Sequence, residues 1–231
     1  MLRLVRPDRS YSPETVAVGR AKANPIVFIV DDDVDVCQAL SDLIESVGLR
    51  TETFTTAADF LKISLPEEAS CLILDVRLPG LSGLDFQSEL GLAKNNIPII
   101  FITGHGDIPM TVKAMKAGAI DFLTKPVREQ DLLDAIRVAL DRDRAQREDV
   151  KESLALRARF DALSPREKDV LALVTAGLMN KQVAGEMGVS EVTVKVHRHN
   201  LMKKLSAQSL ADLVRMADFL RVSRSNDIVH G

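Results

Sequence analysis

The chain has 231 residues, of which 46% are hydrophobic and 27% are charged, and it contains no tryptophan. This length suits two small domains, and the composition is that of a folded protein. No run of 18 apolar residues and no apolar segment near the N-terminus occurs, so we expect a cytoplasmic protein without a membrane span or secretory signal. Cys37 and Cys71 stand in apolar segments without metal-ligand spacing, which favours buried thiols over a disulfide.

Between residues 25 and 145, short apolar segments alternate with helical patterns, whereas residues 1–24 have neither period and are predicted to form a disordered tail. The expected strands are Ile26–Val30, Arg50–Phe54, Cys71–Leu74, Pro98–Ile102 and Ala119–Leu123. The expected helices are Val34–Val47, Ala57–Lys62, Leu84–Lys94, Pro109–Lys116 and one that begins near Arg128. This alternation predicts a parallel α/β sheet with helices on both faces.

Polar side chains gather where the predicted strands end. Asp31, Asp32 and Asp33 follow the first strand, Asp75 the third, Thr103 the fourth and Lys125 the fifth. Ligands of open parallel sheets bind beyond the carboxyl ends of the strands, so we expect one crevice lined by these groups. Carboxylates that meet there require a cation, and oxygen ligands favour Mg²⁺ (or Mn²⁺), which suits phosphoryl transfer.

Four segments, in order and each on its expected element, resemble the receiver domain of bacterial two-component response regulators. They are Phe28-Ile-Val-Asp-Asp-Asp, Leu74-Asp75-Val-Arg-Leu-Pro-Gly, Ile102-Thr103-Gly and Thr124-Lys125-Pro126. The resemblance covers about residues 25–145 and implies a doubly wound sheet with the strand order 2-1-3-4-5. It also implies a sensor histidine kinase as the partner that donates a phosphoryl group.

The same resemblance implies a role for each acidic residue. Asp75 would be the phospho-acceptor, and the metal ligands would be Asp32 and Asp75 through their carboxylates, Asp31 through water and Arg77 through its backbone carbonyl. Asp33 replaces a glutamate that is common in the family, and we expect little consequence.

Three further residues are assigned by the resemblance. Thr103 and Lys125 would hold the phosphoryl group, and Phe122 would be the aromatic residue that responds to it. Phe122 stands where tyrosine is frequent, so its ring has no hydroxyl group with which to report the switched state. The family usually has a cis peptide bond at the position of Lys125-Pro126.

Other classes of protein place acidic residues after a strand. A calcium loop would use Asp31, Asp33 and Asp35, but its sixth position demands glycine and is Val36 here, which excludes it. A phosphatase of the haloacid-dehalogenase type stays an alternative, although Asp35 stands where that motif has threonine or valine. A third reading is a DNA-binding protein that works without phosphorylation and keeps the first domain as an interaction module.

The last third of the chain has the pattern of a helix-turn-helix domain. Ser164 begins a helix that Gly177 ends, Asn180 is expected to cap Lys181–Met187, and Ser209 begins a fourth helix. Between them, Gly188-Val189-Ser190 forms a tight turn, and Ser190 is expected to cap the helix Glu191–Leu205.

The helix Glu191–Leu205 carries an expected apolar stripe and a basic remainder. The stripe consists of Val192, Val194, Leu201 and Leu205, and the basic residues are Lys195, His197, Arg198, His199, Lys203 and Lys204. A helix-turn-helix places the early turns of its second helix in the major groove, where Lys195, Val196 and His199 would lie.

Residues from Leu163 to Leu205 resemble the output domain of the LuxR/NarL/FixJ regulators, notably Gly177-Leu-Met-Asn-Lys-Gln-Val-Ala and Thr193-Val-Lys-Val-His-Arg. The resemblance implies that Lys195, Val196 and His199 face bases. It implies contacts to the DNA backbone from Asn180, Ser190, Thr193 and Lys203.

Both domains together resemble the FixJ branch, with a weaker resemblance to regulators of aromatic-hydrocarbon degradation. This implies a phosphorylated homodimer that binds promoter DNA, with RNA polymerase as a further partner. The expected parts are a receiver domain (25–145), a helical linker (146–162), a DNA-binding domain (163–222) and a disordered tail (223–231).

The segment that joins the domains has neither glycine nor proline from Val127 to Leu163. Its apolar stripe stops over Asp141–Asp149, and Val150, Leu154 and Ala158 resume it. We therefore predict one long helix that projects into solvent, reaches at least Val150 and can extend to Phe160, with a middle that packs against nothing. A flexible linker is the alternative.

Overall fold

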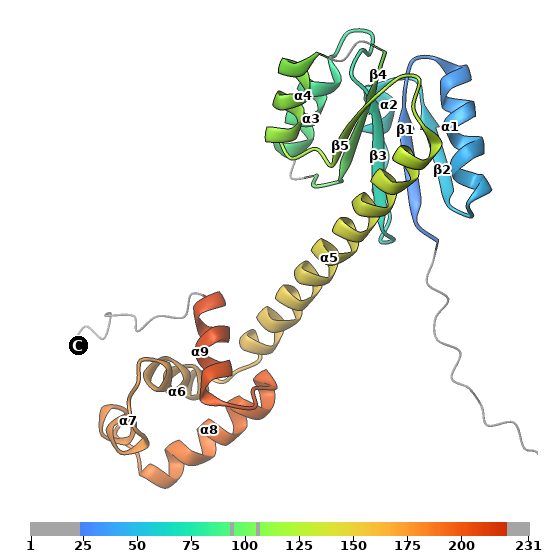
Figure 1. Cartoon of the computed structure of the whole chain (residues 1–231). Coiled ribbons are helices and arrows are strands. Elements are labelled where there is room, and N and C mark those ends of the chain that lie inside the picture. Colours follow the sequence, from blue (N-terminus) through green and yellow to red (C-terminus); the bar gives the residue numbers. More distant parts are fainter. Residues whose placement is uncertain (1–23, 93–94, 105–106, 221–231) are drawn as a thin grey trace, which may run out of the picture. The chain divides into compact units, whose positions relative to one another are not determined.

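The computed structural model describes residues 24–92, 95–104 and 107–220, which form two compact units divided after Asp143 (Figure 1). The two predicted disordered tails lie outside the described residues, apart from Asn24. Residues 221 and 222, with which the second domain was expected to end, also lie outside them. Among the described residues, no helix combines the length and the apolar character that crossing a bilayer requires.

The first unit contains a five-stranded parallel sheet with the order β2-β1-β3-β4-β5, which confirms the predicted fold class. The strands are β1 (Ile26–Val30), β2 (Arg50–Phe54), β3 (Ser70–Asp75), β4 (Ile99–Thr103) and β5 (Asp121–Thr124). The helices between them are α1 (Val34–Ser46), α2 (Ala57–Phe60), α3 (Gly83–Leu92) and α4 (Ile108–Lys116). β5 begins two residues later than predicted because the backbone N–H of Ala119 still donates to the carbonyl oxygen of Ala114 in α4, at 3.2 Å.

Helices cover both faces of the sheet (Figure 1). On one face α1 packs with the first half of α5 (Glu129–Asp161), and on the other α2, α3 and α4 pack together. Cys37 and Cys71 belong to the α1 side and are buried free thiols, as predicted. Burial raises the pKa of both thiols, so they are protonated at neutral pH.

The joining segment is one helix, because α5 runs from Glu129 to Asp161 without a break. The expectation that its middle packs against nothing is wrong at Asp143, which is 4% exposed and accepts a hydrogen bond from the Ser70 backbone N–H at 2.9 Å. A carboxylate that satisfies a buried backbone donor can occupy a core-facing position, so the apolar pattern alone underestimates how far the helix packs on the sheet.

The apolar residues expected to resume the stripe are also not the ones that pack. Val150 and Leu154 are 53% and 66% exposed, whereas Leu156 and Phe160 pack against the core of the second unit. The ring of Phe160 has the Nζ of Lys168 at 4.9 Å from its centroid. The packed face is therefore rotated away from the predicted one.

The second unit is helical, with α6 (Pro165–Thr175), α7 (Asn180–Met187), α8 (Glu191–Leu205) and α9 (Leu210–Phe219). Ser164, Ser190 and Ser209 cap α6, α8 and α9 as predicted. The prediction that Asn180 is a cap is wrong, because α7 begins at Asn180 itself. The backbone N–H of Met179 instead donates to Gln182 Oε1 at 2.8 Å.

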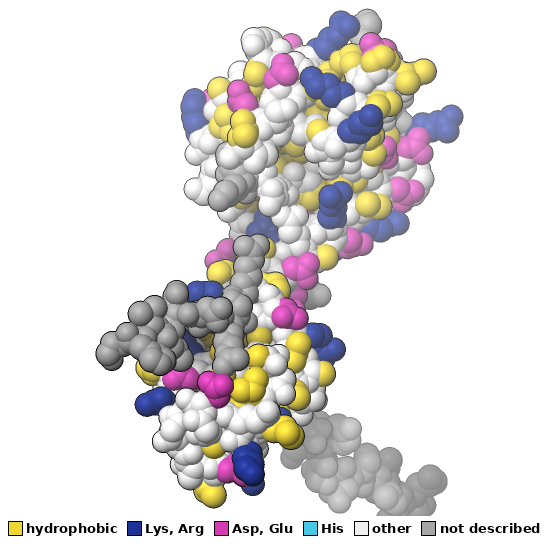
Figure 2. Space-filling view, turned by 90° about the vertical axis from the view of Figure 1, so that its left-hand side faces the viewer, with side chains coloured by type: hydrophobic (Ala, Val, Ile, Leu, Met, Phe, Trp, Pro, Cys, Tyr) yellow, Lys and Arg dark blue, Asp and Glu magenta, His cyan; other side chains and the backbone are white. Residues whose placement is uncertain are grey.

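Charged side chains of both signs are mixed on the face of the protein drawn in Figure 2. A mixed surface attracts a polyanion only weakly as a whole. The face drawn there is therefore not one that would attract a polyanion strongly.

Candidate functional site

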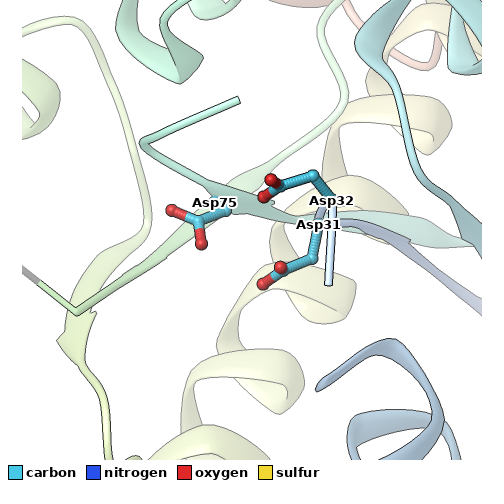
Figure 3. A group of neighbouring side chains, drawn as sticks. All are labelled: Asp31, Asp32 and Asp75. Atoms are coloured by element: carbon cyan, nitrogen blue, oxygen red, sulfur yellow. The ribbon is translucent and has the colours of Figure 1, made fainter. Parts of the chain in front are cut away.

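Three carboxylates meet at the carboxyl ends of β1 and β3. One oxygen atom each of Asp31, Asp32 and Asp75 lies within 4.8 Å of the others, with Asp31 and Asp75 buried and Asp32 exposed. The three groups extend to the same side of the sheet (Figure 3). The parallel register sets Val30 opposite Leu74, so the aspartates that follow these two residues come to neighbouring positions.

The ammonium group of Lys125 binds two of these carboxylates. Its Nζ donates to Asp31 Oδ2 at 2.6 Å and to Asp75 Oδ2 at 2.7 Å. Its backbone N–H donates to the carbonyl oxygen of Thr103 at 2.8 Å, which ties the segment after β5 to the end of β4. Hydrogen bonds between charged partners are among the strongest in proteins, so the lysine is firmly held.

The charges of the cluster influence one another. Burial raises the pKa of Asp31 more than the hydrogen bond from Lys125 lowers it. For Lys125, burial alone would lower the pKa, but the hydrogen bonds to Asp31 and Asp75 outweigh it and raise the pKa. The ammonium group contacts two of the three carboxylates, and the oxygen donor set of all three fits a hard divalent cation such as Mg²⁺ or Mn²⁺.

Thr103 lies on β4, which pairs with β3, and Phe122 lies on β5, which pairs with β4. Thr103 is the last residue of β4 and is fully buried. Phe122 lies in β5 and packs against the core, with its ring centroid 6.1 Å from that of Phe101. The Lys125-Pro126 peptide bond is cis, as the family resemblance led us to expect.

The segment after Asp75 folds back on the carboxylate. The Arg77 backbone N–H donates to Asp75 Oδ1 at 2.9 Å, and Arg77 pairs with Ser82 in an isolated antiparallel bridge. Both oxygen atoms of Asp75 thus have hydrogen-bond partners, one in this segment and one in Lys125.

Asp33 has a structural role that the sequence analysis missed. Its Oδ1 accepts hydrogen bonds from the backbone N–H groups of Asp35 (2.9 Å) and Val36 (3.3 Å), which caps α1. Its own N–H donates to Asp31 Oδ1 at 3.0 Å. An aspartate directly before a helical pattern is a capping signal, and this signal was available in the sequence.

In the second unit, α7, the turn after Gly188 and α8 form the predicted helix-turn-helix, and Gly188 has a φ of +65°. Val194, Leu201 and Leu205 of α8 are buried in the core. Val192 was expected to join this stripe but is 69% exposed, so that part of the prediction is wrong. The period of the helix turns Val192 away from the face that the other three residues share.

The residues predicted to read bases all lie on the exposed side of α8. Val196 is 52% exposed, and Lys195 and His199 are exposed as well. The Nζ of Lys195 lies 3.4 Å from Glu191 Oε1 in the preceding turn. An exposed ion pair of this kind contributes little free energy, so it leaves the lysine available to another acceptor.

The residues predicted to contact the DNA backbone are partly held by neighbours. The hydroxyl groups of Ser190 and Thr193 are 2.8 Å apart, and Asn180 Oδ1 accepts a hydrogen bond from Arg198 Nη1 at 3.1 Å. Lys203 is exposed on the last turn of α8. The contact from Arg198 orients Asn180 toward α8, and it could not be predicted from sequence patterns because the two residues are on different helices.

An ion pair between a buried glutamate and an exposed lysine joins α6 to α8. Glu167 is 4% exposed, and its Oε2 accepts hydrogen bonds from Lys204 Nζ and from the Ser164 backbone N–H, both at 2.7 Å. Burial alone would raise the pKa of Glu167, but these hydrogen bonds outweigh it and lower the pKa. The pair fixes the end of α8, the predicted DNA-reading helix, to the first turn of α6.

We predict that Glu167→Gln lowers the free energy of unfolding of the second unit by roughly 1 kcal/mol at pH 7. A lowered pKa contributes stability above the unfolded pKa and loses it as the pH falls through the folded value. The difference between wild type and variant should therefore shrink as the pH falls below the ordinary value of 4.5. Amide hydrogen exchange of peptides from α6 and α8 measures this, with the exposed Glu148→Gln as control. A difference that grows toward acid pH would contradict it.

Two family models match the chain. The response regulator receiver domain matches residues 27–137, and the bacterial regulatory proteins of the luxR family match residues 161–217. The chain therefore belongs to the response regulators that combine a receiver domain with a LuxR-type DNA-binding domain.

Relatives with curated descriptions match over most of their lengths. Nodulation protein W of Bradyrhizobium diazoefficiens is 54% identical over 206 residues, which is 89% of this chain and 91% of that protein. Response regulator protein TmoT of Ectopseudomonas mendocina is 53% identical over 86% of this chain and 90% of its own. Transcriptional regulatory protein FixJ of Rhizobium meliloti is 43% identical over 83% and 94%.

Solved structures of response regulators are also similar to this chain over most of its length. The response regulator StyR has a TM-score of 0.76 with 52% identity and covers 85% of this chain and 99% of its own. Full-length FixJ from B. japonicum has a TM-score of 0.51 with 35% identity and covers 88% and 100%. These proteins are consistent with both resemblances drawn from the sequence, to the FixJ branch and to regulators of aromatic degradation.

Proposed function

We propose that the protein is a transcription factor whose DNA binding is controlled by phosphorylation of Asp75. A sensor histidine kinase donates the phosphoryl group, the modified protein dimerises, and the dimer binds paired sites in promoter DNA and contacts RNA polymerase. Because its target is DNA, the protein would work in the cytoplasm. The observation that carries this proposal is the contact of Lys125 with Asp31 and Asp75 in a chain that also has a LuxR-type domain.

Each residue of the first site has a proposed role in phosphoryl transfer. An oxygen of Asp75 forms the new bond to phosphorus as the bond to the kinase histidine breaks. Asp31, Asp32, Asp75 and the carbonyl group of Arg77 would hold Mg²⁺ (or Mn²⁺), which supplies charge neutralisation for the phosphoryl oxygens. Thr103 and Lys125 would bind the phosphoryl group, with Phe122 as the residue whose position changes.

The second site would read DNA with α8. Lys195, Val196 and His199 are proposed to contact bases, while Asn180, Ser190, Thr193 and Lys203 contact or position backbone phosphates. We also propose the domain limits 25–145, 146–162 and 163–222 for receiver, linker and DNA-binding domain. With these limits the second half of α5 forms the linker, and phosphorylation acts through dimerisation rather than by uncovering α8.

One incubation tests this function against its alternatives. The full chain is mixed with acetyl phosphate and Mg²⁺, and the intact mass and the released phosphate are followed in time. We expect one phosphoryl group on each chain, located on Asp75. Continuous release of phosphate without a labelled protein would identify a phosphatase, and no reaction would favour a binding protein that works without phosphorylation.

A variant of Lys125 separates uptake of phosphate from the response to it. Lys125→Ala should retain much of the uptake, because Asp75 and the carboxylates beside it remain. It should lose most of the phosphate-induced dimerisation, since the ammonium group that would bind the phosphoryl group is gone. Sedimentation velocity with and without acetyl phosphate measures this, with the exposed Lys62→Ala as control. If Lys125→Ala dimerises like wild type, the proposed role is wrong.

A further inference from the structure

One face of α3 touches the segment that carries Asp75. A Cβ atom on Gly83 would lie 2.5 Å from the carbonyl oxygen of Asp75 and 3.2 Å from the ring of Phe101, so only glycine fits there. The Gly83 backbone N–H also donates to the carbonyl oxygen of Val76 at 2.9 Å. A movement of the segment after Asp75 would therefore push directly on the first turn of α3.

The same face of α3 touches the end of α4 one turn later. Gln87 follows Gly83 by four residues and is 7% exposed, and positions four apart lie on one side of a helix. Its Nε2 lies 3.3 Å from the carbonyl oxygen of Ala117 and 3.5 Å from that of Ala114, and donates to both. Gln87 thus connects α3 to the C-terminal end of α4.

Packing of the core alone does not explain why residue 87 has an amide group. Its Oε1 is buried and accepts no hydrogen bond from any described residue, and a buried polar atom without a partner is unfavourable. Exchanging the amide nitrogen and oxygen would set an oxygen atom against two carbonyl oxygens, which is worse. An apolar residue would fill this space without leaving a buried polar atom unpaired. What glutamine adds is the N–H group that donates to the carbonyl oxygens at the end of α4.

The end of α4 adjoins the parts of the receiver that would change when Asp75 is phosphorylated. α4 exposes Ile108, Val112 and Met115, which are 80%, 44% and 43% exposed. After α4 the chain turns at Gly118 and enters β5, which contains Phe122. A shift of this helix end would change an exposed apolar face and the position of Phe122 together.

We propose that Gln87 is a positioning residue that holds α4 in the arrangement of the unmodified protein and passes movement of the Asp75 segment to it. Phosphorylation places a phosphoryl group on one carboxylate oxygen, and both Asp75 oxygens have partners here, Arg77 and Lys125. One of these contacts must change, the segment moves, and α3 withdraws the Gln87 amide from the two carbonyl groups. This inference rests on the proposed phosphorylation of Asp75.

The test is Gln87→Met in the full chain, which keeps the length of the side chain and removes the donor. Without phosphodonor, the dimer dissociation constant should fall at least about fivefold below that of wild type, because the unmodified arrangement has lost a restraint. Uptake of phosphate from acetyl phosphate should stay within about twofold, since Gln87 does not touch Asp75. Sedimentation velocity and intact mass on the same samples give both values.

Two further variants make the result specific. Gln87→Asn keeps an amide but is too short to reach α4, so it should shift the dimer in the same direction, and it serves if Gln87→Met does not fold. Gln130→Met makes the same change on the exposed side of α5, where Gln130 donates to Asp134, and should behave as wild type.

The outcomes separate this inference from the proposed function. Folded Gln87 variants with the same dimerisation as wild type would overturn the inference, and so would variants that stay monomeric after phosphorylation. Wild-type protein that takes up no phosphate would instead overturn the proposed function.

Discussion

Replacing Asp75 by asparagine should abolish incorporation of phosphate and leave the fold intact. Asparagine has nearly the shape of aspartate, and its carbonyl oxygen can still accept the hydrogen bond from the Arg77 N–H. It lacks the anionic oxygen that would form the bond to phosphorus. Intact mass after incubation with acetyl phosphate and Mg²⁺ should show one added phosphoryl group on wild type and none on Asp75→Asn.

The control for this experiment is Asp85→Asn, the same change at an exposed position in the first turn of α3. It should be labelled like wild type. Circular dichroism of all three proteins should be equal, which shows that loss of labelling is not loss of structure. Equal labelling of wild type and Asp75→Asn would place the acceptor elsewhere.

Lys195→Ala and Lys203→Ala should weaken DNA binding in different ways. Lys195 lies on the early, exposed turns of α8, so its loss should cost about 1–3 kcal/mol on a specific site and much less on random DNA. Lys203 lies on the last turn and is proposed to contact phosphate. Its loss should weaken both kinds of DNA alike and reduce the slope of log affinity against log salt by about 1.

These losses are measured by fluorescence anisotropy at several salt concentrations, on a duplex selected from a random library by the phosphorylated protein and on an unrelated duplex. Lys151→Ala, an exposed lysine of α5 that pairs with Glu148, should change neither affinity. Equal losses on both duplexes for Lys195→Ala would remove Lys195 from the residues that read sequence.

The arrangement of the first site could be predicted from the sequence because strand ends determine it. Asp31, Asp75, Thr103 and Lys125 each follow or end an apolar strand, and parallel strands place such residues at one edge of the sheet. The local capping signals at Ser164, Ser190 and Ser209 were also sufficient, since each cap depends on atoms within three residues.

Contacts between side chains on separate elements could not be predicted. Asp143 reaches Ser70 across 73 positions, and Gln87 reaches Ala117 across 30. Asp143 lies where the apolar pattern is interrupted, and Gln87 lies at a buried position where an apolar residue is expected. The assignment of Asn180 as a cap was wrong because its side chain accepts a hydrogen bond from Arg198 on another helix. At the start of α7, the Met179 N–H donates to Gln182 instead.

Phosphorylation of Asp75 is proposed to control binding to DNA. The most direct measurement is the affinity of the full chain for the selected duplex, with and without acetyl phosphate and Mg²⁺, for wild type and Asp75→Asn. We expect the phosphodonor to raise the affinity of wild type by at least about tenfold, within the usual range of coupling between two sites, and to leave that of Asp75→Asn unchanged. An equal affinity of wild type in both conditions, with Asp75 phosphorylated in one of them, would contradict it.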